Sequence, residues 1–339
     1  MRSTSLLVLV TASVVTTLAG CSAPEPVTHP EAMRFERGGL AIEHLGSIDR
    51  LTWFGPVNGP NMLFTQMLDQ PPAEDGSYTF FGGCYTWVAP QTGPLGWRGP
   101  DGEQLPWPPD PAMDIGPAQT IGQTRAGITT RTPVSRAGLR EVKTFALRKD
   151  GVGEISNELV NWGDEPRTVG TWINTAVHDQ GVIAVRFDPE HDDAIWGWNQ
   201  ESIDRFLSIL APSDVKGWSL VRTADADWEG GGKVYLDDHP HFENTSWVSP
   251  EIAVWRRGYW LHRKGHAPVD GAALRAMGEG PVAIYIQPAS GDSRAVIEAE
   301  LYGPIEEIGP GERTSAGEQW TLIKAATPSV RTMLDALRD

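Results

Sequence analysis

The chain has 339 residues and a formal net charge of −16 at pH 7. A surface this acidic repels nucleic acid and anionic lipid headgroups, so no nucleic-acid partner is expected. The sequence contains 37 Gly, 27 Pro and 14 Trp against 6 Tyr, a composition that favours strands and turns over helices.

The N-terminus has the features of a lipoprotein signal peptide. Its first twenty residues hold one charge, Arg2, and the apolar run from Leu6 to Val15 is too short to span a bilayer. The sequence LAGC follows at residues 18–21 and is a lipobox, which predicts cleavage before Cys21 and lipidation of that cysteine. The alternative is an ordinary secretory signal with a cysteine at its cleavage point.

This signal predicts the domain organisation and the location of the protein. Residues 1–20 are the signal peptide, residues 21–30 a tether and residues 31–339 a single domain. Acyl chains on Cys21 are expected to hold the mature protein on a membrane of the cell envelope. Because Ser22 rather than Asp follows Cys21, resemblance to enterobacterial sorting points to the outer membrane, with the protein facing the periplasm.

After the tether, apolar residues mostly recur at every second position, which is the period of a strand. The dipeptide Asp150-Gly151 and the segment GDEP at residues 163–166 separate three of the clearest runs and predict an antiparallel meander. Strands are predicted over residues 39–48, 139–147, 152–160, 167–173, 182–187, 218–223, 233–236, 252–256, 259–263, 282–287, 295–302 and 319–323.

Helical spacing is scarce in this sequence. Residues 202–210 and 330–337 are the candidates for short helices. No linker follows His29 and no internal repeat is present, so the sequence predicts one all-β domain of antiparallel strands, which we expect to be a monomer.

Three segments, in this order along the chain, resemble one known superfamily. They are FFGGCYTWVAPQ (residues 80–91) followed by LPWPPDPAMDIGP, then GEISNELVNWGDEPRTVGTWIN (153–174) and EAELYGPIEEIGPGERTSAGEQWTL (298–322). Together they are similar to the galactose mutarotase-like, or aldose 1-epimerase-like, superfamily, and most similar to a bacterial group of unknown function within it. The resemblance implies a β-supersandwich fold.

The resemblance also suggests where catalytic residues would lie. Mutarotation needs a general base and a general acid, and the superfamily supplies a Glu and a His. Glu300 matches the C-terminal Glu; the alternative is a solvated residue of an acidic strand. The family's His motif falls on residues 171–175, where no His is present, so His178 nearby is the candidate acid. Cys84 stands where the smaller group usually has His, and we interpret it as a buried apolar filler.

Aromatic residues indicate carbohydrate binding instead of, or besides, catalysis. A flat indole can stack on the apolar C–H face of a sugar while its N–H bonds a hydroxyl. Trp172 in mid-strand is predicted to be a core residue, whereas Trp107 among prolines is predicted to be a rigid loop platform. The predicted pocket contains Trp87, Trp107, Asn174, Lys264 and Glu300.

A loop rich in His and Asp offers a possible metal site. The segment DDHPHFEN contains His239 and His241, and ligands at this density can hold Zn²⁺ or Ca²⁺, but turn loops of this composition are common without metal. We therefore assign no metal and no cofactor.

Three functions remain open at this stage. The first is a membrane-anchored lipoprotein whose domain binds a carbohydrate or polyol. The second is an aldose 1-epimerase-like or other carbohydrate-processing enzyme that uses Glu300. The third is a non-catalytic interaction protein of the cell envelope.

Overall fold

The computed structural model describes residues 28–71, 78–91, 97–99, 101–187, 194–225, 231–237, 247–289 and 295–338. The signal peptide, Cys21, His239 and His241 lie outside the described residues, so the predictions made for them stay predictions. In the part of the chain that is described, we find no helix of the length and apolar character that a membrane crossing requires.

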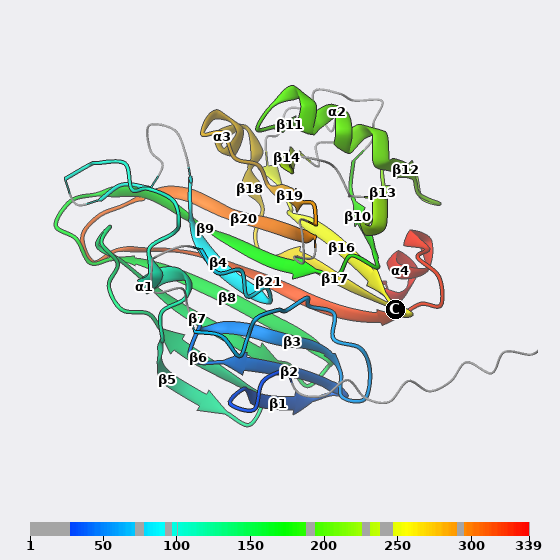
Figure 1. Cartoon of the computed structure of the whole chain (residues 1–339), viewed down its shortest axis with the longest axis horizontal. Coiled ribbons are helices and arrows are strands. Elements are labelled where there is room, and N and C mark those ends of the chain that lie inside the picture. Colours follow the sequence, from blue (N-terminus) through cyan, green and yellow to red (C-terminus); the bar gives the residue numbers. More distant parts are fainter. Residues whose placement is uncertain are drawn as a thin grey trace, which may run out of the picture.

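The described strands form two large antiparallel sheets, one of nine strands and one of ten (Figure 1). The first sheet has the order β1-β2-β3-β4-β9-β20-β19-β14-β11. Its strands are β1 (Met33–Arg37), β2 (Leu40–Leu45), β3 (Arg50–Pro56), β4 (Cys84–Ala89), β9 (Arg167–Val177), β20 (Val296–Ile308), β19 (Val282–Gln287), β14 (Gly232–Leu236) and β11 (Ile195–Gly197).

The second sheet has the order β12-β13-β10-β16-β17-β21-β8-β7-β6-β5. Its strands are β12 (Leu210–Pro212), β13 (Ser219–Arg222), β10 (Val182–Val185), β16 (Glu251–Arg256), β17 (Tyr259–Gly265), β21 (Arg313–Lys324), β8 (Val152–Asn161), β7 (Leu139–Leu147), β6 (Gly127–Arg131) and β5 (Gln119–Thr124). A small ribbon pairs β15 (Trp247–Val248) with β18 (Val269–Asp270).

Helices are few and short among the described residues, as the sequence predicts: α1 (Pro111–Asp114), α2 (Gln200–Ile209), α3 (Gly271–Ala276) and α4 (Val330–Ala336). The predicted helices over residues 202–210 and 330–337 are α2 and α4. Figure 1 shows α2 and α3 on one side of the molecule and α4 near the C-terminal end. Asn199 caps α2 by accepting a hydrogen bond from the backbone N–H of Ser202 at 2.8 Å.

The predicted meander is correct for its first two strands and wrong for the third, because β9 pairs with β4 and β20 in the other sheet and not with β8. Strands β7 and β8 pair in register from Leu139 opposite Asn161 to Leu147 opposite Gly153, and both alternate between buried and half-buried residues. The turn between them places Gly151 at φ +79°, in the left-handed region that glycine adopts without strain. After β8 the chain crosses from the second sheet to the first, where it forms β9.

The apolar core lies between the two sheets. Ile173 of β9 and Cys84 of β4 pack there against Leu261 of β17 and Trp320 of β21. A second part of the core continues along the sheets through Leu301 of β20 and its neighbours. Because the core-facing side chains of the first sheet alternate with outward-facing ones, the sheet presents a second, different face on its other side.

Candidate functional site

The outward face of the first sheet is aromatic and polar where its inward face is aliphatic. On β20, Ala299 and Leu301 belong to the core, so Glu298, Glu300 and Tyr302 point the other way. Residues directly opposite each other on neighbouring strands share one face of the sheet, so they form rows that run across the strands. The rows run through the pairs Trp87–Trp172, Trp172–Tyr302, Tyr85–Asn174, Asn174–Glu300, Tyr285–Glu298 and Lys233–Tyr285.

A cleft of about 830 Å³ opens over these rows. Five strands, β4, β9, β20, β19 and β14, supply lining residues, and loops beside β4 and β11 supply the rims. The cleft lining combines aromatic and charged side chains, among them Tyr78, Trp87, Trp107, Trp172, Trp198, Lys233, Tyr285, Glu298 and Glu300.

A buried ion pair lies at the centre of the cleft floor. Nζ of Lys233 is 2.6 Å from Oε2 of Glu300, and both side chains are almost fully buried. The same carboxylate oxygen accepts a hydrogen bond from the indole N–H of Trp172 at 2.9 Å. The ammonium also donates to the hydroxyl of Tyr302 at 2.9 Å and lies 3.6 Å from the ring centroid of Trp172, a cation–π contact. Contacts among side chains of β9, β14 and β20 therefore fix the positions of both charged groups.

A second carboxyl group, Glu298, lies two residues before Glu300 on the same face. It accepts a hydrogen bond from the hydroxyl of Tyr85. Burial, together with the negative charge of Glu300, raises the pKa of Glu298 to about 8. Burial also raises the pKa of Glu300, against the opposing effect of the Lys233 charge. The site thus favours the protonated form of Glu298, beside a carboxyl group that is paired with an ammonium.

The floor also holds polar atoms that have unused hydrogen-bonding capacity. Among the described residues, neither amide atom of Asn174 has a hydrogen-bond partner, and the same is true of Oε1 of Glu300. The two residues are direct cross-strand partners. Because a buried polar group without a partner costs about 1–3 kcal/mol, Oε1 of Glu300, which lines the cleft, is suited to accept a hydrogen bond from a ligand hydroxyl group.

Trp87 is held rigidly at one side of the cleft. Its indole N–H donates to Oδ1 of Asp114 at 2.6 Å, and Arg50 pairs with the same carboxylate oxygen at 2.6 Å. The Arg50 guanidinium in turn lies 3.9 Å from the ring centroid of Tyr85. Asp114 belongs to α1, so this short helix and its buried ion pair orient the aromatic wall.

The structure brings some of the sequence-predicted site residues together and separates others. Trp87, Trp107 and Glu300 line one cleft, whereas Asn174, the cross-strand partner of Glu300, is fully buried and is not among the lining residues. Lys264 does not line this cleft, because it lies on β17 of the second sheet, where its side chain is exposed.

His178 is also separate from the cleft lining. Its Nε2 lies 2.9 Å from the carbonyl oxygen of Leu63, and its ring packs edge-on against Phe64. Cys84 is fully buried in the core, where burial raises the pKa of its thiol to about 12, in agreement with its interpretation as a filler. Trp172 is buried as predicted, yet one side of it also faces the cleft.

Sequence reasoning missed Lys233, Glu298 and Tyr85. For Glu298 a signal was present, because a residue two positions before Glu300 on a strand shares its face. For Lys233 no local signal exists, since it reaches Glu300 only through the order of β14, β19 and β20 in the sheet.

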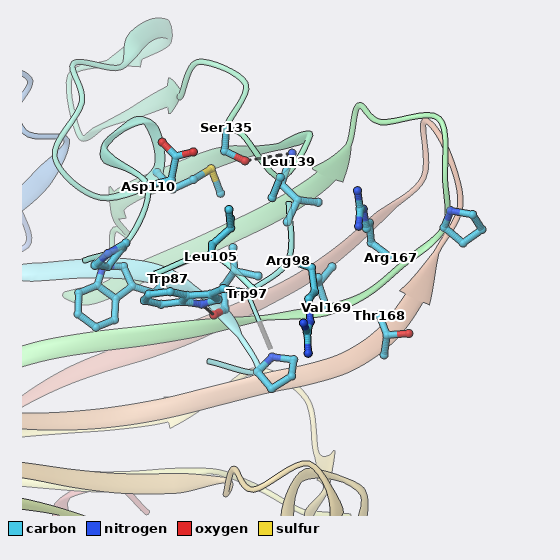
Figure 2. Close-up of a pocket in the computed structure, with 16 residues that line it drawn as sticks. Trp87, Trp97, Arg98, Leu105, Asp110, Ser135, Leu139, Arg167, Thr168 and Val169 are labelled. Carbon is cyan, nitrogen blue, oxygen red and sulfur yellow. Dashed lines mark hydrogen bonds between the residues drawn. The ribbon is translucent and has the colours of Figure 1, made fainter. Parts of the chain in front are cut away.

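A smaller pocket of about 210 Å³ lies next to the cleft and shares Trp87 with it (Figure 2). Figure 2 shows Trp87 and Trp97 at one end of this pocket and Arg98 and Arg167 toward the other. Trp97 also stacks on Trp107 with an interplanar angle of 12°. One aromatic wall therefore separates the small pocket from the cleft.

Comparison with known proteins identifies the fold. No family model and no curated protein sequence matches this chain. A crystal structure of a galactose mutarotase-like protein from Lactobacillus casei superposes with a TM-score of 0.51 at 10% identity, covering 86% of this chain and 100% of the other. A galactose mutarotase-like protein from Clostridium acetobutylicum gives 0.50 at 9% identity, covering 86% and 95%. The predicted all-β supersandwich is confirmed, and the chain has the galactose mutarotase-like fold.

Proposed function

We propose that this protein binds a carbohydrate or a similar polyol in the cleft on the outward face of the first sheet. The observation that carries the proposal is the Lys233–Glu300 ion pair, which lies among aromatic side chains and lines the floor of the cleft. Indole rings supply apolar faces for the C–H groups of a sugar, while the ammonium and the carboxylate supply partners for its hydroxyl groups.

A second candidate function is acid–base chemistry on the bound sugar. The observation that favours it is the pair of carboxyl groups on β20, whose surroundings differ: Glu298 bonds to Tyr85, and Glu300 is paired with Lys233. Two titratable groups with different environments are the usual arrangement for a proton donor and a proton acceptor. In this reading Glu298 takes the acid role for which the sequence suggested His178, and Glu300 is the base.

One experiment tests both functions. Calorimetric titration with a panel of mono- and oligosaccharides is expected to give heat with the wild type, and Glu300→Gln is expected to weaken binding by about tenfold or more, because a charge-assisted hydrogen bond is lost. Optical rotation followed in the same mixtures reports anomer interconversion. A rate above background that falls in Glu298→Gln and in Glu300→Gln supports the enzyme; binding with no such rate supports the binding protein.

The matched control for this experiment is Trp162→Ala. Trp162 is as exposed as the rim tryptophans, but its ring lies under Arg140 and does not line the cleft. Its removal is expected to leave the binding heat unchanged. A panel that gives no heat with the wild type contradicts the proposed function.

We further propose that the protein is a lipoprotein of the cell envelope, on the support of the LAGC segment that ends at Cys21. Replacing Cys21 with serine removes the thiol that lipidation requires. The full chain is expected to fractionate with membranes in a bacterial host, and Cys21→Ser to fractionate with soluble proteins or to keep its signal peptide. Equal membrane association of both forms, with the signal removed from both, contradicts lipidation.

A further inference from the structure

The cleft has two exposed tryptophans, one at each side. Trp107 is 53% exposed and Trp198 is 56% exposed, whereas Trp87 and Trp172, which line the same cleft, are 4% and 2% exposed. Large apolar side chains left in solvent at the rim of a polar cleft are candidates for ligand contacts. The buried pair shapes the cleft, and the exposed pair is free to receive a ligand.

Trp107 is backed by other aromatic rings. Its ring centroid is 5.0 Å from that of Tyr78 and 5.6 Å from that of Trp87, the latter in an edge-to-face arrangement. Trp97 stacks on it from the side of the small pocket. Pro106 and Pro108 flank it in the chain and restrict its backbone. An exposed ring supported in this way is a preorganised platform, which loses little conformational freedom on binding.

Trp198 is a second platform built from other elements. It directly follows β11, and its backbone N–H donates to the carbonyl of Lys233 at 3.2 Å. Its ring centroid is 5.7 Å from that of Tyr285 on β19. This platform is therefore supported by β11 and β19, the two strands that flank β14 with its Lys233, whereas Trp107 packs against β4.

The lateral separation of the strands that support the two platforms follows from the strand order. Trp107 lies against Trp87 of β4, and Trp198 lies against Tyr285 of β19, with β9 and β20 between these strands. Neighbouring strands are about 4.8 Å apart, so the supporting strands are separated by about 14 Å. One pyranose ring does not span this distance. Trp172, Glu298 and Glu300 fill the interval with hydrogen-bonding groups.

We infer that the ligand of this cleft is an oligosaccharide of at least two linked sugar rings, which contacts both the Trp107 platform and the Trp198 platform. The inference rests on the proposed function and adds the size of the ligand to it. A cleft of about 830 Å³ is in the range of sites that enclose whole drug-sized ligands, which agrees with more than one ring. A free monosaccharide would leave one of the two platforms in solvent.

The test is titration calorimetry with glucose, N-acetylglucosamine and their β-1,4-linked and α-1,4-linked oligomers up to the tetrasaccharide. Within the series that binds, the tetrasaccharide is expected to bind about tenfold or more tightly than the monosaccharide, because stacking on the second platform adds to the contacts of the first. In Trp198→Ala the ratio of tetrasaccharide affinity to monosaccharide affinity is expected to fall to about one. Trp162→Ala, with an exposed indole outside the cleft, is expected to keep the wild-type ratio.

Two results overturn the inference and are distinguishable from failure of the proposed function. If monosaccharide and tetrasaccharide bind equally tightly, the cleft binds sugars but does not require linked rings. If the ratio survives in Trp198→Ala, the second platform has no part in the selection. If no sugar of any length gives heat, the proposed function itself is wrong, and this inference is wrong with it.

Discussion

Replacing Arg263 with methionine is expected to lower the free energy of unfolding by about 3–5 kcal/mol, the cost of leaving a buried charge without its partner. Arg263 lies on β17 between the sheets and is completely buried. Its Nε and Nη2 donate to the two carboxylate oxygens of Glu318, each at 2.8 Å. Chemical denaturation of wild type and Arg263→Met measures the loss.

The same side chain connects the second sheet to the floor of the cleft. Nη1 of Arg263 donates to the carbonyl of Ala299 at 2.6 Å, and Nη2 donates to the carbonyl of Ile173 at 3.4 Å. Ala299 lies between Glu298 and Glu300, so the guanidinium holds the backbone from which both carboxyl groups project. We therefore expect Arg263→Met to weaken sugar binding as well.

The double variant Arg263→Met, Glu318→Gln is the control for this prediction. It removes the unpaired charge, while the new amide oxygen can still accept the hydrogen bond that Trp320 gives to Glu318 at 2.7 Å. Because apolar or neutral replacements of buried ion pairs are often tolerated, the double variant is expected to recover most of the lost stability. Equal destabilisation of both variants contradicts the assignment of the loss to an unpaired Glu318.

The stability of the protein is expected to fall as pH rises, owing to Glu298. The pKa of this carboxyl is raised from 4.5 to about 8 in the folded state, mainly by burial. Between these values the folded protein keeps a proton that the unfolded chain has released, so the folded state binds more protons. Each pH unit in this range therefore removes up to about 1.4 kcal/mol of stability, and above pH 8 the contribution of this group no longer changes.

Glu298→Gln isolates this effect from other titrating groups. Glutamine cannot ionise, yet its amide oxygen can still accept the hydrogen bond from Tyr85. Urea unfolding is measured at several pH values from 5 to 8.5. The free energy of unfolding of the variant is expected to increase relative to that of the wild type as pH rises. If the two stability curves stay parallel, Glu298 does not hold its proton in the folded state.

The sequence predicts those strands best that have one buried and one solvated face. Strand β7 is such a case: its predicted bounds, 139–147, match the structure because buried and half-buried residues alternate along it. Strands β3 and β4 are buried on both faces, so their side chains show no alternation and periodicity does not reveal them. Strand β20 runs to Ile308, beyond the predicted end at residue 302, because a register shift after Tyr302 interrupts the period.

Residues of the candidate site could be predicted only where a local sequence motif identifies them. Glu300 was found through its match to the superfamily motif, and Trp107 through the prolines around it. Lys233 is 67 positions from Glu300 in the sequence and meets it only through pairing of β14, β19 and β20. Lys264 was misplaced for the same reason: position in the sequence does not say which of two stacked sheets carries a strand.

The measurement that tests the central claim most directly is a crystal structure of the protein soaked with the oligosaccharide that binds most tightly in calorimetry. Sugar rings are expected against Trp107 and Trp198, with a hydroxyl group within hydrogen-bond distance of Oε1 of Glu300. Sugar bound at any other surface, with the cleft over the Lys233–Glu300 pair free of it, would contradict carbohydrate binding in this cleft.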